Sequence, residues 1–164
     1  MKYYLPIVFI LIFSCDEPLQ PETDPSLILS SQSTAITTND TLDVSLNLND
    51  NIVSIFGIYV KIDYDSSLLS FSDTAGFVAG NYFGGNNITF VKEKNGSIFL
   101  TVTLTQGVEK KSGTGLLGSL TFFPKLEGSA TISIDEEELE FYNDFGNIIE
   151  IINIETESLI IEIN

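Results

Sequence analysis

Apolar and polar residues alternate along much of this chain, which is the pattern of strands that have one buried face. The clearest case is residues 56–64, where every second residue is apolar and the residues between are Gly57, Tyr59, Lys61 and Asp63. The side chains predicted to face a core are Phe56, Ile58, Val60, Ile62 and Tyr64. Turn-forming residues 65–67 follow, and residues 68–71 form a short apolar plug. We predict one long, half-buried strand here.

Similar segments recur through the rest of the chain, separated by turn-forming residues. Asn95-Gly96 is typical of a type I′ hairpin turn. The acidic segment 155–157 is expected to separate the last two strands. None of the segments has a long helical period, so the pattern predicts an all-β sandwich. The predicted strands are 27–31, 41–48, 56–64, 88–91, 97–105, 116–123, 130–134, 139–142, 148–154 and 158–163.

The composition of the chain excludes several classes of function. The chain has 164 residues, 43% of them hydrophobic, which suits one domain with its own core. Its net charge of -16 would repel nucleic acids and anionic lipid headgroups. It has no His and a single Cys, which removes the commonest general base, internal disulfides and thiolate zinc clusters. We expect a protein that is not an enzyme and has no cofactor.

The N-terminus has the features of a secretion signal. Met1-Lys2 precedes a largely apolar run over residues 3–13, which is shorter than the roughly 20 residues that span a bilayer. The run ends at Ile12-Phe13-Ser14-Cys15, which resembles the bacterial lipobox. That resemblance implies cleavage before Cys15 by a signal peptidase of type II, and acylation of Cys15. A protein anchored in this way is tethered to the membrane without spanning it.

The predicted organisation therefore has three parts. Residues 1–14 are a lipoprotein signal peptide, 15–26 are the lipidated Cys with an acidic, Pro-containing linker, and 27–164 are the folded domain. Asp16-Glu17 resembles the surface-export signal of Bacteroidota lipoproteins, and solvated linker charge explains it equally well. The expected location is the outer membrane, lipid-anchored and exposed at the cell surface.

Five blocks of sequence, in their order, resemble the cohesin module of bacterial cellulosomes. The resemblance covers residues 27–163. It implies a nine-stranded jelly-roll β-sandwich, an architecture shared with carbohydrate-binding modules, and a protein partner, the dockerin, on one open sheet face. The blocks are TLDV at 41–44, FGIYVKIDYD at 56–65 followed by LLSF at 68–71, GNYFG at 80–84, GLLGSLTF at 115–122 and NDFGN at 143–147.

Periodicity selects the residues that would form this face. They alternate with the core residues of their strands and combine aromatic, hydroxyl and charged groups, as protein interfaces do. Ordinary solvated positions on a sheet explain each of them equally well. The predicted partner-binding face consists of Tyr59, Lys61, Asp63, Thr89, Val91, Phe99, Thr101, Thr103, Ser119 and Thr121.

The predicted function is a non-catalytic, cell-surface binding module with a protein partner, dockerin-like or of another kind. Carbohydrate binding is the alternative, in a polysaccharide-utilisation or adhesion system. Sugar platforms usually need exposed aromatic residues, above all Trp, and this chain has no Trp. The residues that could substitute are Tyr59, Tyr82, Phe83 and Tyr142, of which Tyr82 and Phe83 could instead plug the end of the sandwich.

Two groups of carboxylates are candidates for a metal site or a catalytic pair. The run 135–138 has four acidic residues that could contribute to a Ca²⁺ site, but it lacks the spaced pattern of a calcium loop, and solvated charge is the favoured interpretation. Glycosidases use a pair of carboxylates, and Asp63 and Asp65 lie on one side of a strand, yet nothing in the sequence indicates a cleft around them. We predict no metal site and no catalytic residue.

Overall fold

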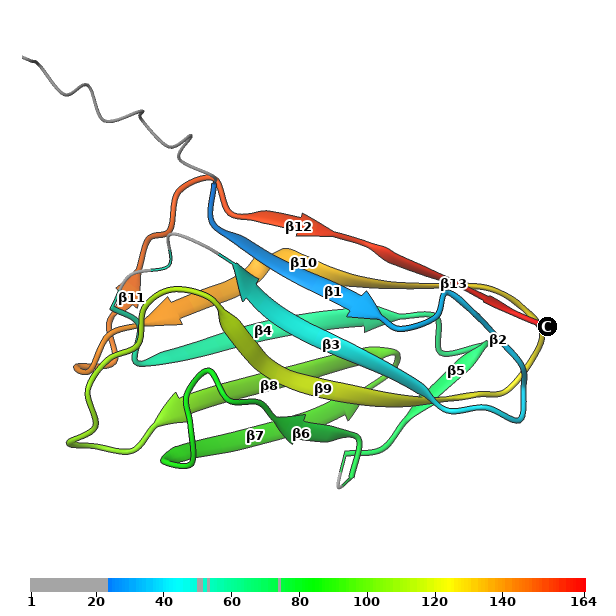
Figure 1. Cartoon of the computed structure of the whole chain (residues 1–164), viewed down its shortest axis with the longest axis horizontal. Coiled ribbons are helices and arrows are strands. Elements are labelled where there is room, and N and C mark those ends of the chain that lie inside the picture. The colour runs from blue at the N-terminus through cyan, green and yellow to red at the C-terminus, as the bar shows by residue number, and fades with distance from the viewer. Residues whose placement is uncertain (1–23, 50–51, 53, 74) are drawn as a thin grey trace, which may run out of the picture.

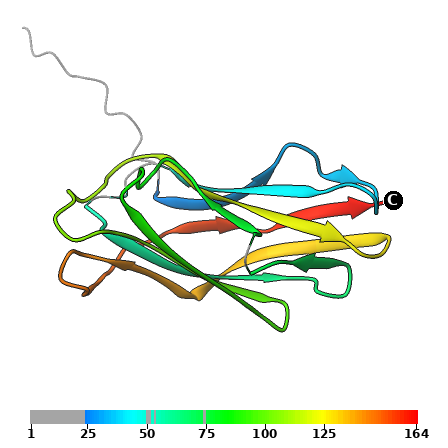
Figure 2. The same cartoon turned by 90° about the horizontal axis from the view of Figure 1, so that it is seen from below.

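The domain is an all-β sandwich of two sheets, as the sequence predicts (Figure 1). A computed structural model describes residues 24–49, 52, 54–73 and 75–164, and this part contains no helix. It accordingly has no helix long and apolar enough to cross a membrane. The predicted signal peptide and Cys15 lie outside the described residues. The strands run along the long axis of the domain (Figure 2).

Each sheet is built around one central group of antiparallel strands. Sheet A has the order β12 (Glu155–Glu157), β1 (Ser26–Ser31), β3 (Leu42–Asn49), β9 (Gly115–Pro124) and β5 (Leu69–Phe71), with β6 (Phe77–Ala79) also on β9. Sheet B has the order β2 (Ala35–Ile36), β13 (Leu159–Ile163), β10 (Gly128–Tyr142), β4 (Gly57–Tyr64), β8 (Ser97–Leu104) and β7 (Asn87–Lys94), with β11 (Ile148–Ile149) also on β10.

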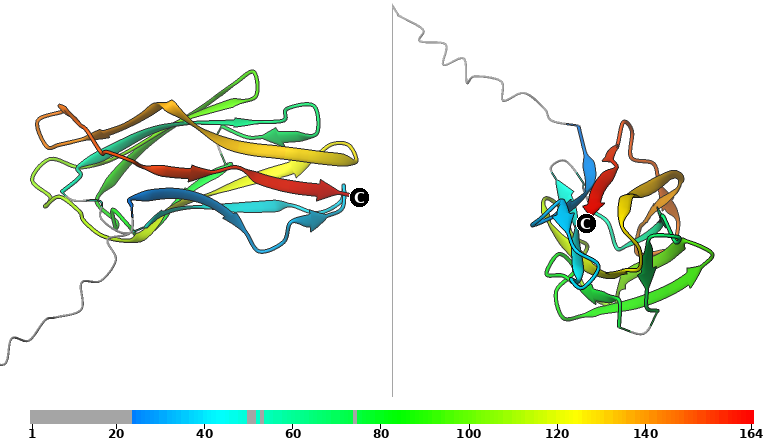
Figure 3. Two further views of the ribbon diagram at one scale, coloured as in Figure 1. Left: turned by 90° about the horizontal axis from the view of Figure 1, so that it is seen from above. Right: turned by 90° about the vertical axis from the view of Figure 1, so that its right-hand side faces the viewer.

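The end-on view shows the two sheets facing each other (Figure 3). One hydrophobic core lies between them. Ile58, Val60 and Ile62 of β4 are 0% exposed, which confirms the predicted inner face of that strand. Phe122 of β9 reaches the same core from sheet A and lies 5.3 Å from the ring of Tyr64, centroid to centroid. Burial of apolar side chains from both sheets is the main force that holds such a sandwich together.

The two ends of the chain close one side of the sandwich. The N-terminal segment runs from β1 in sheet A to β2 in sheet B, and the C-terminal segment runs beside it from β12 to β13 (Figure 3). Both pairings, β1 with β12 and β2 with β13, are parallel. Each segment thus hydrogen-bonds in both sheets, and the edge strands on this side, β12 and β2, are only three and two residues long. Very short edge strands offer little backbone to another chain.

Most predicted strands are confirmed, and three features differ. Residues 155–157, predicted as a separator, form β12, because their backbone groups pair with β1 although their side chains are acidic. Residues 148–154 form only the two-residue β11. The predicted strands 130–134 and 139–142 are one strand, β10, interrupted by an irregularity between Asp135 and Leu139. The predicted number of nine strands stays open, because the shortest segments can be counted separately or as extensions of others.

The loop before β7 plugs one end of the sandwich. Tyr82 and Phe83 are only 7% and 3% exposed, and their rings meet edge to face at 5.0 Å. The backbone N–H groups of Gly80 and Tyr82 donate to carbonyl oxygens of β9 at 2.8 and 2.9 Å. Gly80 approaches β9 so closely that a Cβ atom there would lie 2.2 Å from the carbonyl oxygen of Leu116. The interpretation of these aromatic residues as a plug is therefore confirmed.

A second contact fixes the loop before β6 to strand β7. One oxygen of Asp73 accepts a hydrogen bond from the Lys92 ammonium at 2.6 Å, and the other accepts from the backbone N–H of Glu93 at 2.5 Å. The hydrogen bond from Lys92 is the main cause that holds the pKa of Asp73 below its ordinary value, and the hydrogen bond from the Glu93 N–H is the second cause. This carboxylate links sheet A to the outermost strand of sheet B.

The close approach of Gly80 gives the first prediction. Gly80→Ala should destabilise the domain by about 2 kcal/mol and lower its Tm by roughly 5 °C or more, because the new methyl group would push the plug loop away from β9. Gly85→Ala is the matched control, since a Cβ atom at Gly85 meets nothing within 4 Å. Calorimetry of both variants measures the difference, and equal Tm values would contradict the predicted clash.

The Asp73 contact gives a prediction about pH. A pKa that is depressed in the folded state stabilises the fold above the unfolded-state pKa of about 3.9, and this stabilisation is lost as the pH falls through the folded-state pKa. Asp73→Asn should therefore be less stable than the wild type at pH 7, and the difference in Tm should shrink below about pH 4. Glu127→Gln, an exposed carboxylate in the turn between β9 and β10, is the control. A difference that is the same at pH 3 and pH 7 would show that charge is not its cause.

Candidate functional site

Six of the ten predicted face residues lie together on the outer surface of sheet B. Tyr59, Lys61 and Asp63 come from β4, and their side chains point away from the core because those of Ile58, Val60 and Ile62 point into it. The neighbouring strand β8 contributes the other three in register, with Thr103, Thr101 and Phe99 opposite Gly57, Tyr59 and Lys61. We call the outer surface of β10, β4, β8 and β7 the open face.

Two predicted residues, Thr89 and Val91, point to the other side of sheet B. Their cross-strand partners are Val102 and Leu100, both buried, so Thr89 and Val91 face inward. The residues of β7 on the open face are instead Ile88 and Phe90, which are 44% and 64% exposed. The prediction was wrong because it assigned the apolar residues of this edge strand to the core, whereas here they face solvent.

The last two predicted residues, Ser119 and Thr121, lie on the other sheet. They belong to β9 of sheet A, where they pair with Ser45 and Asp43 on the outward side of that sheet. The alternation of residues tells which side of a strand faces the core, but not which of the two sheets contains the strand. Ser119 and Thr121 therefore do not belong to the same face as the other predicted residues. Partner binding by the remaining six residues stays a prediction.

The open face carries exposed apolar side chains next to its aromatic ones. Cross-strand pairing arranges the residues of this face, polar and apolar, in three rows across the strands. The rows are Tyr142, Gly57, Thr103 and Ile88; Glu140, Tyr59, Thr101 and Phe90; and Asp135, Lys61, Phe99 and Lys92. Ile148 of β11, 62% exposed, extends the first row beyond Tyr142. We call Tyr59, Ile88, Phe90, Phe99, Tyr142 and Ile148 the apolar patch. Sequence reasoning missed Ile88, Phe90 and Ile148, although an apolar residue on both sides of an edge strand is a signal that could have found the first two.

Gly57 is the one position in the first row that has no side chain. It stands between Tyr142 and Thr103 in the pairing. A Cβ atom at Gly57 would lie 3.0 Å from the hydroxyl oxygen of Thr103, which is tighter than an ordinary contact. The Thr103 hydroxyl donates to the carbonyl oxygen of Phe56 at 3.4 Å. The Thr103 side chain therefore occupies the space beside Gly57.

The charged residues at the centre of the open face form one ion-pair network of a lysine and two aspartates. The Lys61 ammonium donates to Asp135 at 2.7 Å and lies 3.6 Å from Asp63. The Asp135 hydrogen bond raises the pKa of Lys61, and the same bond lowers the pKa of Asp135. Asp63 also accepts a hydrogen bond from the Ser97 hydroxyl at 2.5 Å. Lys61 is therefore held in place as one member of an ion-pair network.

Two tyrosines of the patch hold carboxylates of β10. The Tyr59 hydroxyl donates to Glu138 at 3.2 Å, and the Tyr142 hydroxyl donates to Glu140. Burial, with the hydrogen bond to Glu138, raises the pKa of Tyr59. The hydrogen bond to Glu140 is the main cause that raises the pKa of Tyr142 to about 12. Both phenols consequently remain neutral donors near neutral pH.

The acidic run 135–138 forms the irregularity of β10. Asp135 pairs with Lys61 and Leu139 with Val60, so residues 136–138 have no place in the ladder with β4. Their carboxylates go to separate partners, since Glu136 accepts from the Thr156 hydroxyl at 2.7 Å and Glu138 accepts from Tyr59. In the described part of the chain no group of three or more Asp, Glu, Cys or His residues is arranged to hold a metal ion.

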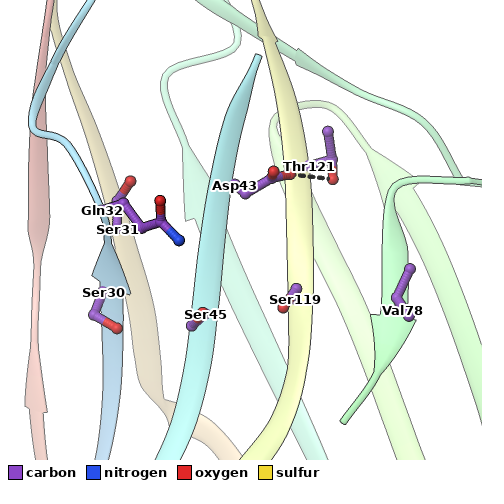
Figure 4. Close-up of a pocket in the computed structure, with 8 residues that line it drawn as sticks. All are labelled: Ser30, Ser31, Gln32, Asp43, Ser45, Val78, Ser119 and Thr121. Carbon is purple, nitrogen blue, oxygen red and sulfur yellow. Dashed lines mark hydrogen bonds between the residues drawn. The ribbon is translucent and has the colours of Figure 1, made fainter.

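A shallow polar hollow lies on the outer side of sheet A, opposite the open face (Figure 4). Its volume is about 550 Å³. The Thr121 hydroxyl donates to Asp43 within it at 2.6 Å, and no aromatic side chain lines it. The hollow therefore lacks the flat apolar surface on which a sugar ring stacks. Its lining residues are Ser30, Ser31, Gln32, Asp43, Ser45, Val78, Ser119 and Thr121.

The two outer surfaces of the sandwich thus differ in chemistry. The open face combines exposed aromatic and aliphatic side chains with the Lys61 ion pairs and the glutamates of β10. The hollow on the opposite face is lined mainly by polar side chains, and the exposed apolar residues of that face are Val78 and Phe123. Exposed apolar patches bordered by polar residues are typical of surfaces that bind other molecules. The open face is the candidate functional site.

The sequence matches no protein-family model and no curated protein. Solved structures do match. A non-cellulosomal cohesin from the hyperthermophilic archaeon Archaeoglobus fulgidus has a TM-score of 0.67 and 16% identity over 87% of this chain and 92% of its own. A type II cohesin domain from the cellulosome of Acetivibrio cellulolyticus has a TM-score of 0.69 and 14% identity over 85% and 95% of the two chains.

A third structure, a mutant type II cohesin–X–dockerin complex from Acetivibrio cellulolyticus, contains a chain with a TM-score of 0.71 and 14% identity, covering 86% of this chain and 100% of that one. At such low identity the likeness concerns the fold, and it extends over nearly the whole described domain. The chain therefore has a cohesin-like all-β sandwich fold.

Proposed function

We propose that this protein is a non-catalytic binding module that captures a protein partner on the open face of sheet B. The observation that carries the proposal is the apolar patch, in which Phe90 and Ile88 are 64% and 44% exposed beside Tyr59 and Phe99. Exposing such side chains to water is unfavourable, and an interface that covers them recovers the hydrophobic free energy. Aromatic residues are also the usual energetic centres of protein interfaces.

The structural comparisons support a protein as the partner. Similar folds include a cohesin in a cohesin–X–dockerin complex and a cohesin in complex with a dockerin, both from Acetivibrio cellulolyticus. We propose a dockerin-like protein as one candidate partner for this chain, and another protein with a complementary surface is equally compatible with the patch. Function is decided by the site rather than by the fold, so the patch itself has to be tested.

The carbohydrate alternative has less support from the geometry. Tyr82 and Phe83 are buried in the plug, which leaves Tyr59 and Tyr142 of the four proposed sugar-binding aromatics on the surface of the described domain. Both of these donate their hydroxyl groups to glutamates of the same face. Protein binding therefore explains the exposed apolar residues better than sugar binding does.

The proposal includes a location. Cys15 follows a signal-like apolar run and precedes an acidic linker, so a lipid on Cys15 would tether the module to the outer membrane with the domain at the cell surface. There the open face would display a secreted protein or join an assembly for glycan uptake or adhesion. The sequence alone supports this location, because Cys15 lies outside the described residues.

Removing the exposed apolar side chains tests the binding face. Phe90→Ser combined with Ile88→Ser should lower recovery of a specific secreted partner at least roughly tenfold, because hot-spot aromatic residues contribute about 2 kcal/mol or more to binding. The measurement is quantitative mass spectrometry of proteins retained from the secretome by immobilised wild-type and variant protein. Both residues are exposed, so the fold should be retained.

The matched control for this experiment removes exposed apolar side chains from the other sheet. Val78→Ser with Phe123→Ser changes residues that are 66% and 45% exposed on the outer side of sheet A. The control should retain the same partner as the wild type. If the Phe90→Ser, Ile88→Ser variant still retains the partner and the Val78→Ser, Phe123→Ser variant does not, the binding surface lies on sheet A.

Lipid attachment is tested at Cys15. Cys15→Ala should prevent acylation, so the protein should disappear from the outer-membrane fraction, and the intact mass of the remaining protein should lack the acyl groups. Protease treatment of whole cells that express the wild type should remove the domain if it lies at the surface. A Cys15→Ala protein that stays in the outer-membrane fraction would contradict the proposed anchor.

A further inference from the structure

The apolar patch is bordered along one side by uncompensated negative charge. Residues Glu136, Glu137, Glu138 and Glu140 lie along β10, and we call them the acidic rim. In the described part of the chain, no lysine lies within ion-pairing distance of any of these four glutamates. The rim therefore remains available to a partner's cations.

The rim is held in a defined position. Glu138 and Glu140 accept hydrogen bonds from the hydroxyl groups of Tyr59 and Tyr142, which are themselves members of the apolar patch. Glu136 is held from the other side by Thr156 of β12. Glu138 and Glu140 thus lie directly beside the apolar surface, where a partner covering the patch would partly desolvate them. Glu136 lies farther out, on the side toward β12. Ion pairs formed at such a boundary orient the two proteins.

The opposite side of the open face has a different charge. Lys92 and Lys94 project from β7, and Lys92 is bound to Asp73 at 2.6 Å. The central Lys61 is likewise neutralised by Asp135 and Asp63. Across the strands, then, the face changes from acidic at β10, through the Lys61 network and the apolar residues at its centre, to the lysines of β7. All seven basic residues of the chain are lysines, against 23 Asp and Glu residues.

We propose that the protein partner presents apolar side chains flanked on one side by Lys or Arg residues, which pair with the acidic rim of β10 while the apolar groups cover the patch. This inference rests on the proposed function and specifies the partner's chemistry. The net charge of -16 favours such a partner at long range as well, because it would accelerate the approach of a basic surface. The same charge opposes docking of a second copy of this chain.

The test uses two synthetic amphipathic helical peptides that have the same apolar face and one Trp each. Lysines flank the apolar face in the first peptide, and glutamates flank it in the second. Because the protein has no Trp, the fluorescence of the peptide reports binding without background. We expect the lysine peptide to bind roughly tenfold more tightly than the glutamate peptide at low ionic strength, and this preference to weaken as salt is added.

Variants then locate the charge effect. Glu138→Gln with Glu140→Gln keeps an oxygen that accepts from each tyrosine but removes two charges, and it should weaken binding of the lysine peptide roughly fivefold. Glu155→Gln with Glu157→Gln removes two charges from β12 of sheet A and should change the affinity less than about twofold. Equal losses in both pairs of variants would mean that net charge alone attracts the peptide, and would overturn the role of the rim.

The possible failures are distinguishable. If both peptides bind equally and both lose affinity with Phe90→Ser and Ile88→Ser, the patch binds but the inference about charge is wrong, and the proposed function stands. If binding survives these two substitutions, the open face is not the binding surface and both proposals fail. Absence of binding by the lysine peptide overturns the inference, as does a dimer in sedimentation analysis that the two substitutions dissociate.

Discussion

Strand β4 is the constraint on which the rest of the candidate site depends. It lies between β10 and β8 and pairs with both along its length, so its register is fixed from two sides. Its inner residues Ile58, Val60 and Ile62 are all 0% exposed. A slip of one residue would exchange the faces, moving these three into water and Lys61 into the core. Burial on the inner side therefore positions Tyr59 and Lys61 on the outer side.

The irregularity in β10 follows from the same constraint. Both halves of β10 are anchored in the core, by Ile132 at 0% exposure on one side and Phe141 at 2% on the other. Each half is in register with β4, and three residues more than the ladder can hold lie between them. These residues, 136–138, are all glutamates and are expelled to the surface, since a buried carboxylate without a partner would be costly. The acidic rim is thus a consequence of packing on the inner side.

Local pattern was sufficient to predict most of the fold. Asn95 and Gly96 have φ angles of 57° and 85°, as the predicted hairpin turn requires, and β8 alternates between buried and outward residues as expected. Backbone pairing was harder to predict. Strand β12 forms because its backbone hydrogen-bonds to β1, and its acidic side chains give no sign of this pairing. Short β2 and β6 were missed because two or three residues are too few to show a period.

The site was only partly predictable, for two physical reasons. Alternation identifies the two opposite sides of a strand. Hydrophobicity shows which side faces the core only when the other side is polar. In β7 the outward residues Ile88 and Phe90 are more apolar than the inward Thr89. Assignment of a strand to a sheet depends on contacts between residues far apart in sequence, which is why Ser119 and Thr121 were placed on the wrong surface. The first of these errors is informative, since apolar residues that face water mark the patch itself.

The position of β1 relates the proposed anchor to the proposed binding face. Strand β1 begins at the end of the sandwich that carries β11, and the row from Ile148 to Ile88 crosses the open face at this same end (Figure 1). Residues 16–25 separate Cys15 from β1. Ten residues span at most about 35 Å, close to the diameter of a small domain. An anchored module would thus hold its patch within a domain's diameter of the membrane, and the net charge of -16 would repel anionic headgroups and leave the domain exposed to a basic partner in the medium.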